Sequence, residues 1–234
     1  MRHGHVDYFA VKSTQFREIS LSPDGVEQAE AAALALKHIA FDIAVYSGLQ
    51  RTRETAERVL AAQENPPKLI AEEGLEELKN GVVTASSRKE LAAWLAYSFD
   101  SADEDGATFL PEGERFDSAE NRIVAAFTEM VTNGDWKSAL VVAHEGVNRI
   151  LLGWACGGGL ATISAFDQDL AGVNVIDVDI TPNAAGDGLQ VERAIIKALN
   201  VTPYDYTKSG LPRTSLEHLF DIDWNGPRPK RPKM

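Results

Sequence analysis

Short apolar runs alternate with longer amphipathic segments along most of this chain, and this alternation constrains its fold more than any other feature. Phe41–Tyr46 and Ala139–Ala143 are compact apolar runs bounded by polar residues, which is the pattern of buried strands. Segments with apolar residues every three or four positions lie around them, as in helices that cover a sheet. Repeated strand–helix units predict an α/β fold, a three-layer α/β/α domain with a mainly parallel sheet.

Caps, spacing and breaks mark the helical segments. Ser22 and Pro23 form an N-cap and first-turn pair ahead of a stretch whose packing face consists of small residues. A second helix is predicted after Ser47, ending before the Pro66-Pro67 break. Further helices are expected at Ser87–Phe99, Glu114–Thr132, Val147–Trp154 and Leu216–Phe220, with an exposed acidic loop at Asp100–Gly113.

Two later apolar runs predict an antiparallel edge on the sheet. Val173–Ile180 and Leu189–Leu199 are separated by a short connection, which favours a hairpin. Residues 1–226 are expected to form one domain, because a chain of 234 residues can bury a full core without disulfides or metals. Residues 227–234 are rich in Pro, Lys and Arg and are predicted to be a flexible basic tail.

The charge balance limits the classes of partner. The chain has 23 basic and 35 acidic residues, a net charge of −12 with neutral histidines. Nucleic acids and anionic membranes bind clustered Lys and Arg, so neither is an expected partner. The start lacks a signal-peptide pattern, and no apolar run is long enough to span a bilayer. The single cysteine, Cys156, lies in an apolar stretch and is expected to be a buried thiol, which suits the cytoplasm.

Four cationic or titratable side chains occupy comparable places in the predicted sheet. Arg51 and His144 each follow a predicted strand, and Arg2 and His3 stand at the start of the chain. Ligands of open α/β sheets bind beyond the carboxyl ends of the strands, so these side chains are expected to converge on one anion. Taken singly, each has an ordinary alternative, namely a polar turn, a surface cation or a structural histidine. Those alternatives give no reason for all of them to lie at one end of the sheet.

The same residues belong to an ordered set of motifs. The motifs are Arg2-His3-Gly4; Leu21-Ser22-Pro23-Asp24-Gly25 through Gln28-Ala29; Val45 to Ala56; Leu75-Glu76-Glu77 with Gly81; Gly113-Glu114; and Val141 to Arg149. In this order, the first two-thirds of the chain resembles the histidine phosphatase superfamily, often called phosphoglycerate mutase-like. A lone Arg-His-Gly triplet is weak evidence, whereas the ordered set is strong.

The resemblance implies a phosphomonoester hydrolase that acts on a small phosphorylated metabolite through a phosphohistidine. His3 would be the nucleophile, Arg2, Arg51 and a protonated His144 would hold the phosphate oxygens, and Glu77 would protonate the leaving alcohol. Arginine presents a fixed fork of donors to phosphate, and nearby cations favour the neutral imidazole that a nucleophile needs. Spacing alone leaves other candidates for the acid: Glu72, Glu73, Glu76, His5 and Asp7.

The chain departs from the family pattern near its start. The family usually has a hydrophobic strand immediately before Arg-His-Gly, whereas Met1 directly precedes Arg2 here. We therefore expect the first strand to be lacking, with a gap at the sheet centre and weaker catalysis than in a version extended upstream. His5 stands where Glu or Gln is common, and Phe9 stands where many members place a phosphate-contacting Asn.

Other functions are left open by the sequence. The enzymatic alternative is a glycolytic phosphoglycerate mutase. The segment after Glu77 is shorter and less Trp-rich than in such a mutase, and this favours a phosphatase. A catalytically silent phosphate-binding protein is the alternative from another class.

Residues 82–112 are a candidate lid insertion whose aromatic residues, Trp94, Tyr97 and Phe99, are either substrate contacts or core. No cofactor or metal is expected, because the five histidines show no ligand spacing backed by carboxylates. The sequence does not decide whether the chain forms a homodimer.

Overall fold

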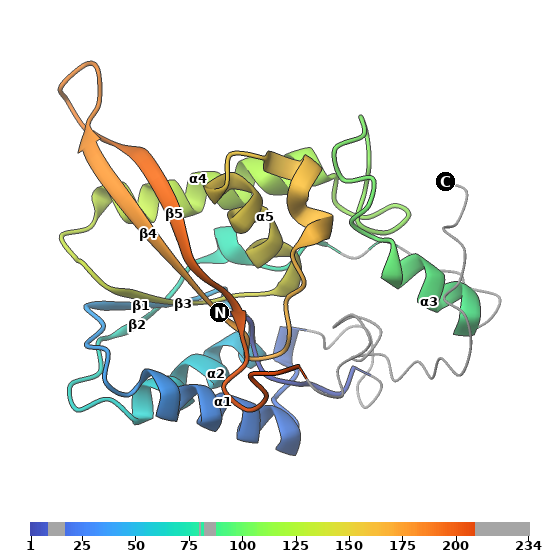
Figure 1. Cartoon of the computed structure of the whole chain (residues 1–234), viewed down its shortest axis with the longest axis horizontal. Coiled ribbons are helices and arrows are strands. Elements are labelled where there is room, and N and C mark those ends of the chain that lie inside the picture. The colour runs from blue at the N-terminus through green and yellow to red at the C-terminus, as the bar shows by residue number, and fades with distance from the viewer. Residues whose placement is uncertain (9–16, 80, 82–87, 209–234) are drawn as a thin grey trace.

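The computed structural model of the protein describes residues 1–8, 17–79, 81 and 88–208 (Figure 1). The predicted helix Leu216–Phe220, the basic tail 227–234 and Phe9 lie outside the described residues.

A parallel three-stranded sheet forms the centre of the fold. Its strands are β1 (Ile43–Tyr46), β2 (Leu69–Ala71) and β3 (Ala139–Val142), in the order β2-β1-β3. Both neighbouring pairs are parallel and in continuous register along β1. The sequence patterns predicted β1 and β3 but not β2, because three residues are too few to show a periodic pattern.

Helices cover both faces of this sheet, as the α/β pattern predicted. Figure 1 shows α1 (Pro23–Leu36) and α2 (Gln50–Ala61) below the sheet, and α4 (Phe116–Asn133) and α5 (Glu145–Ala155) above it. The alternation of side chains along the strands divides the core accordingly. Leu140 and Val142 of β3 pack in the cluster of α1 and α2, whereas Val147 and Ile150 of α5 belong to the other cluster. The three-layer α/β/α architecture is thereby confirmed.

The sequence signals at the helix ends correspond to contacts in the structure. Ser22 caps α1, because its side chain accepts a hydrogen bond from the Gly25 amide at 3.1 Å. Short 3₁₀ helices, η2 (Glu73–Leu75) and η3 (Gly159–Ala165), follow β2 and α5.

The segment from residue 88 to residue 113 is more buried than the sequence indicated. It begins with α3 (Arg88–Ala96) and continues as turns, as the prediction of a loop required. The prediction that this loop is exposed was wrong in part, because Ala102 and Leu110 are buried. Ala102 packs in the core beside Phe99. Apolar residues spaced irregularly in a loop give no periodic signal, so this packing is decided by tertiary contacts.

The predicted hairpin is also present. It consists of β4 (Val173–Pro182) and β5 (Leu189–Val201), which pair antiparallel. The hairpin forms a two-stranded sheet of its own and rises diagonally across the molecule (Figure 1).

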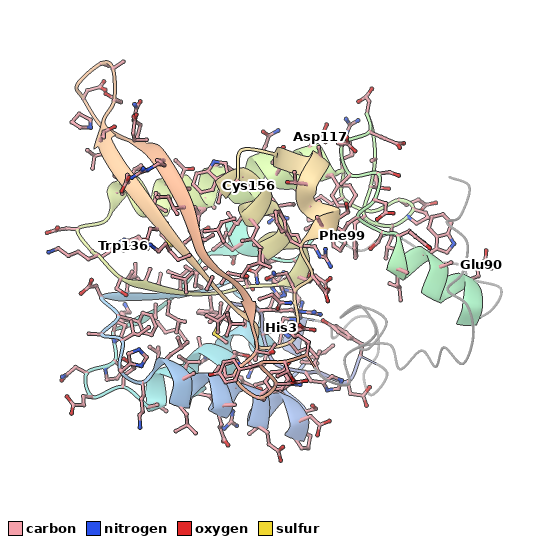
Figure 2. All side chains as sticks on the ribbon, in the orientation of Figure 1. His3, Glu90, Phe99, Asp117, Trp136 and Cys156 are labelled. Carbon is pink, nitrogen blue, oxygen red and sulfur yellow. The ribbon has the colours of Figure 1, made fainter. Side chains whose placement is uncertain are left out.

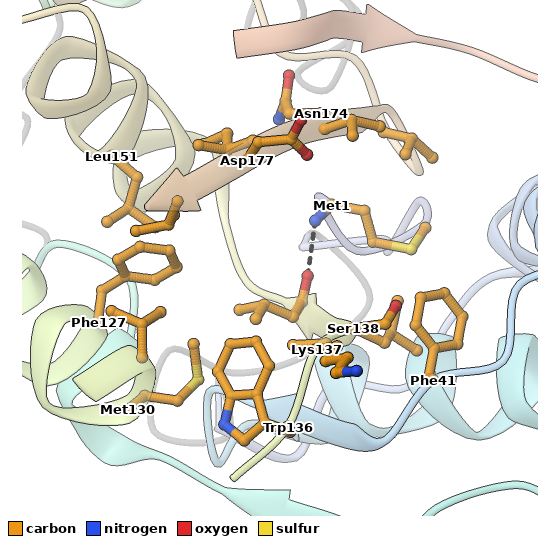
Figure 3. Close-up of a pocket in the computed structure, with 18 of the residues that line it drawn as sticks. Met1, Phe41, Phe127, Met130, Trp136, Lys137, Ser138, Leu151, Asn174 and Asp177 are labelled. Carbon is orange, nitrogen blue, oxygen red and sulfur yellow. Dashed lines mark hydrogen bonds between the residues drawn. The ribbon is translucent and has the colours of Figure 1, made fainter. Parts of the chain in front are cut away.

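The first residues of the chain connect the two sheets. Arg2 forms a parallel bridge with Ala143, just after β3, and its amide donates to the Gly172 carbonyl, just before β4, at 3.0 Å. The amino group of Met1 donates to the Val141 carbonyl at 2.6 Å (dashed line, Figure 3). Residues 1–3 therefore lie as a short strand between β3 and the hairpin.

A cavity of about 650 Å³ continues from Met1 between β3 and β4. Figure 3 shows apolar side chains of several elements around it, among them Phe41, Phe127 and Leu151. Asn148 and Trp136 also line it, and each has a buried side-chain nitrogen without a hydrogen-bond partner among the described residues. The cavity lies between β3 and the hairpin, and the lack of a first strand stays a prediction.

Two further findings concern exposure. The expectation of a buried Cys156 was wrong: this residue caps the carboxyl end of α5, where the helix reaches the surface, and the thiol is exposed. Within the described part of the chain, the helices all fall short of the length and apolar character needed to cross a membrane.

Candidate active site

His3 lies in the interior, above α1 and α2 in the view of Figure 2. The residue is 2% exposed, and its Nδ1 lies 2.7 Å from the carbonyl oxygen of Gly4. A carbonyl oxygen can only accept, so Nδ1 carries the proton and donates it to Gly4. Nε2 then keeps its lone pair, which is the state required of a nitrogen nucleophile.

The surroundings of His3 keep the imidazole neutral. Burial lowers the pKa of His3 well below its ordinary value of 6.5, and the nearby charges of Arg51 and Arg2 lower this pKa further. Its neighbour Gly4 is fixed by a hydrogen bond from the Gly4 amide to Thr55 of α2 at 3.1 Å. The segment that carries the imidazole is thus held by α2.

His144 lies next to His3 at the start of α5. The two ring centroids are 5.2 Å apart, with an angle of 65° between the ring planes. Its Nδ1 lies 3.4 Å from Nη2 of Arg51, and its Nε2 lies 2.7 Å from the hydroxyl of Ser47. Because a guanidinium only donates, Nδ1 accepts and Nε2–H donates to Ser47.

Burial lowers the pKa of His144 well below its ordinary value, with Arg51 as the next cause. This direction favours a neutral His144 in the ligand-free protein, and a protonated His144 on bound phosphate stays a prediction. Burial in an arginine-rich site has no sequence signature of its own, so the sequence motif carries no information on the ligand-free protonation state of His144.

The two arginines of the prediction are both buried in this region. Arg2 is 2% exposed and Arg51, in the first turn of α2, is 4% exposed. The Arg51 guanidinium carbon also lies 5.8 Å from the centre of the Tyr8 ring. The structure therefore brings Arg2, Arg51 and both histidines into one buried region of an otherwise acidic molecule.

Glu77 reaches the same region from the turn after η2. Its carboxylate accepts from the amide of Leu78 at 3.0 Å and lies 3.5 Å from the amide of Gly146 in α5. Burial raises the pKa of Glu77 above its ordinary value of 4.5, which favours the protonated form that an acid needs.

The competing candidates for the acid have other contacts. Glu72 accepts from the amide of Gly74 at 2.9 Å, and Glu76 pairs with Arg17 at 2.5 Å. His5 lies 2.7 Å from the hydroxyl of Ser22, beside the cap of α1, and Asp7 is exposed. The pKa of Glu77 is lowered in part by the charges of Arg51 and Arg2, which places its carboxyl near these two arginines.

Sequence reasoning missed three buried polar residues of this region, Ser47, Glu145 and Arg149. Ser47 lies within 2.7 Å of His144, and Glu145 makes ion pairs with both Arg2 and Arg149 at 2.8 Å. All three belong to motifs already recognised, so their positions were available, but no spacing rule gives their roles.

The aromatic residues of the candidate lid do not share one location. Phe99 packs in the core, under the Arg149 guanidinium at 4.5 Å. Trp94 and Tyr97 line a separate cavity of about 310 Å³ whose walls all come from residues 94–111. Among the described residues, groups of His, Cys, Asp and Glu suited to holding a metal ion are absent.

Comparison with known proteins gives named relatives. A "Probable 2-carboxy-D-arabinitol-1-phosphatase" of Arabidopsis thaliana is 30% identical over 185 residues, covering 78% of this chain and 36% of the relative. An "Adenosylcobalamin/alpha-ribazole phosphatase" of Salmonella typhimurium is 28% identical over 133 residues, covering 56% of this chain and 65% of the relative. The chain thus spans about a third and just under two-thirds of these two relatives.

Solved structures of low sequence identity share the fold. The chain described as "Mycobacterial hydrolase 2" has a TM-score of 0.67 at 20% identity, with 96% of each chain covered. The alpha-ribazole phosphatase of Shigella flexneri has a TM-score of 0.64 at 22% identity, covering 86% of this chain and 94% of that one. The model of the histidine phosphatase superfamily (branch 1) matches residues 1–183. With its motifs, its layers and its buried pair of histidines in agreement with that match, the chain belongs to the histidine phosphatase superfamily.

Proposed function

We propose that this chain is a phosphomonoester hydrolase that takes the phosphoryl group of a small phosphorylated metabolite onto His3. One observation carries the proposal: Nδ1 of His3 is committed to the Gly4 carbonyl, so the lone pair of Nε2 is available in a buried site that also holds Arg2 and Arg51. An anion held by two arginines beside a neutral imidazole is arranged for phosphoryl transfer.

In the first step, Nε2 of His3 attacks phosphorus and the bond from phosphorus to the ester oxygen breaks. The proton of Glu77 goes to the departing oxygen, so that an alcohol leaves rather than an alkoxide. Arg2, Arg51 and His144 contact the phosphoryl oxygens, where negative charge accumulates. The products are phospho-His3, the alcohol and the Glu77 carboxylate.

In the second step, water attacks the phosphorus of phospho-His3. The Glu77 carboxylate accepts the proton from this water, and the bond from Nε2 to phosphorus breaks. Inorganic phosphate leaves, and both His3 and Glu77 return to their initial protonation states. A covalent intermediate divides one slow reaction into two easier ones.

The named relatives support hydrolysis of small phosphorylated metabolites. Their names describe a 2-carboxy-D-arabinitol-1-phosphatase and an adenosylcobalamin/alpha-ribazole phosphatase. We assign this chain the same reaction class but no individual substrate. Cytoplasmic location, a homodimer and a lid made of residues 82–112 remain predictions.

The test is release of inorganic phosphate from an aryl phosphate by the wild type and by His3→Ala. We expect hydrolysis by the wild type and a loss of at least about 10³-fold in the variant, since the covalent route is removed. Rapid quenching in alkali during turnover is expected to trap phosphate on His3, which peptide mapping locates. Equal rates for the two proteins would leave a silent phosphate-binding protein as the better reading.

Hydrolysis is distinguished from a mutase reaction with phosphoglycerate isomers as substrates. Net formation of inorganic phosphate indicates the hydrolase, and exchange between isomers indicates the phosphoglycerate mutase.

A further inference from the structure

We propose that Glu145 is a positioning residue of the phosphate site, which anchors Arg2 so that one edge of the Arg2 guanidinium is presented to the substrate. This inference rests on the proposed function, because it assigns Arg2 to the phosphoryl oxygens. Glu145 occupies the position directly after His144, where the similar family motif has Gly.

Glu145 holds two arginines, one on each carboxylate oxygen. Its Oε2 lies 2.8 Å from Nη1 of Arg2, and its Oε1 lies 2.8 Å from Nη2 and 3.1 Å from Nε of Arg149. The side chains of Arg2, Glu145 and Arg149 are 2%, 3% and 6% exposed, so solvent screening of these pairs is small. We call these three residues the buried triad.

The contacts of Arg2 leave one edge of its guanidinium for a ligand. Nη1 donates to Glu145 and also to the Gln168 carbonyl at 2.5 Å, which occupies both of its hydrogens. Nε is buried and has no hydrogen-bond partner among the described residues. A guanidinium offers Nε–H and Nη2–H as a parallel fork, and this fork matches two oxygens of a phosphate. Glu145 and Gln168 therefore select the edge that faces the substrate.

Arg149 fixes the other side of the Glu145 carboxylate. Its Nη1 donates to the Ile163 carbonyl at 3.0 Å, and its Nη2 lies 3.2 Å from the Asp167 carboxylate. Its guanidinium stacks 4.5 Å from the centre of the Phe99 ring. With four contacts on Arg149, the carboxylate of Glu145 cannot rotate without breaking buried hydrogen bonds.

The triad explains why a carboxylate is suited to a site for a dianion. A buried guanidinium without a counterion is costly, and Arg2 would leave its position or recruit water before substrate arrives. Glu145 removes this cost on the side of Arg2 that faces away from the substrate, so the fork is organised in advance. The charge of Glu145 also contributes to the raised pKa of Glu77, after burial.

The direct test is Glu145→Gln, which keeps the shape of the side chain but places a neutral amide group against one arginine. Binding of inorganic phosphate is measured by calorimetry, and kcat/KM is measured across pH with an aryl phosphate. We expect phosphate affinity to fall about 10- to 100-fold, because the Arg2 fork is displaced. We also expect the alkaline limb of the pH profile to move to lower pH, because Glu77 loses a neighbouring negative charge. A change of stability alone would produce neither effect.

Asp169→Asn is the matched control. Asp169 is another buried carboxylate, and its side chain pairs with Lys208 and accepts from Asn200 at 2.9 Å, rather than from Arg2. We expect it to lower the unfolding temperature while phosphate affinity stays within about threefold. An equal loss of affinity in Asp169→Asn and Glu145→Gln would overturn the proposal.

A second variant covers the case in which Glu145→Gln does not fold. Arg149→Gln frees one carboxylate oxygen of Glu145 without altering Arg2, and we expect a smaller loss of phosphate affinity in the same direction. Unchanged phosphate affinity in folded Glu145→Gln, or in Arg149→Gln, would overturn the anchoring role. Because phosphate binding needs no turnover, absence of His3-dependent hydrolysis would remove the proposed function and leave this binding result to decide the role of Glu145.

Discussion

At the residue scale, the chemistry of the site depends on which ring nitrogens carry protons. The Gly4 carbonyl fixes the tautomer of His3, and the guanidinium of Arg51 with the hydroxyl of Ser47 fixes that of His144. Both assignments follow from what the partners can donate or accept. The two imidazoles are therefore neutral and oriented before a ligand binds.

The pH dependence of hydrolysis follows from His3 and Glu77. Because the pKa of His3 is lowered, kcat/KM is expected to rise as pH increases through a value below 6.5, where His3 loses its proton. Because the pKa of Glu77 is raised, kcat/KM is expected to fall as pH increases through a value above 4.5. A pH profile of Glu77→Gln checks the assignment, since the alkaline limb is expected to disappear. Survival of that limb would identify another residue as the acid.

Phosphate binding is expected to be coupled to protonation of His144. The free imidazole is neutral because its pKa is lowered, and a bound dianion raises that pKa by favouring the charged form. Calorimetry in buffers of different ionisation enthalpy should therefore record more proton uptake in the wild type than in His144→Gln. Identical proton uptake in both proteins would show that His144 stays neutral in the complex.

At the element scale, the position of His3 depends on the close approach of α1. A Cβ added to Gly25 in the first turn of α1 would lie 2.1 Å from the His5 carbonyl oxygen, and one added to Gly4 would lie 2.4 Å from the Gly25 carbonyl oxygen. Both contacts are with backbone atoms that cannot move separately from their elements. The two glycines allow the start of α1 to pack directly on the segment that carries His3.

Gly25→Ala is therefore expected to displace α1 from residues 4–5. The expected loss of unfolding free energy is roughly 1–3 kcal/mol, as for an overpacked core, together with a lower kcat/KM. Denaturant unfolding and the aryl phosphate assay measure the two effects. Leu34→Ala, on the exposed face of the same helix at 66% exposure, is the control and should change neither. A fully active, equally stable Gly25→Ala would contradict this account of the packing.

At the scale of the whole molecule, residues 1–3 join the two sheets by backbone hydrogen bonds, beside the cavity. The buried amino group of Met1 is part of this junction, and burial lowers its pKa from 8.0 to about 5. In the unfolded chain the amino group binds a proton below pH 8.0, whereas in the folded chain it does so only below about pH 5. The unfolded state therefore binds more protons in this window, so stability falls as pH decreases through it.

A segment of about five β-branched residues fused before Met1 is expected to raise the unfolding temperature. The fusion replaces the buried amino group with a peptide amide, and its backbone can pair with β3 and β4 in the cavity and offer carbonyls to Asn148 and Trp136. Stability between pH 5 and 8.0 should then depend less on pH. Thermal unfolding at several pH values measures both effects. If a Gly-Ser segment of the same length stabilises the protein equally, the cavity does not accept a strand.

The sequence by itself determined the elements and the family. Caps, apolar periodicity and short apolar runs gave α1, α2, α4, α5, β1, β3 and the hairpin, because these features depend on residues close together in the chain. The ordered motifs gave His3, Arg2, Arg51, His144 and Glu77 as candidates. Their roles in the reaction remain proposals.

Only the tertiary structure decided the states and partners of these groups. A protonation state depends on burial and on charges contributed by distant segments, so neutral His144 had no sequence signal. The anchoring of Arg2 by Glu145 joins residues 143 positions apart, and the burial of Ala102 depends on packing with other elements. Local sequence patterns carry information about neighbours along the chain, whereas electrostatics and packing depend on neighbours in space.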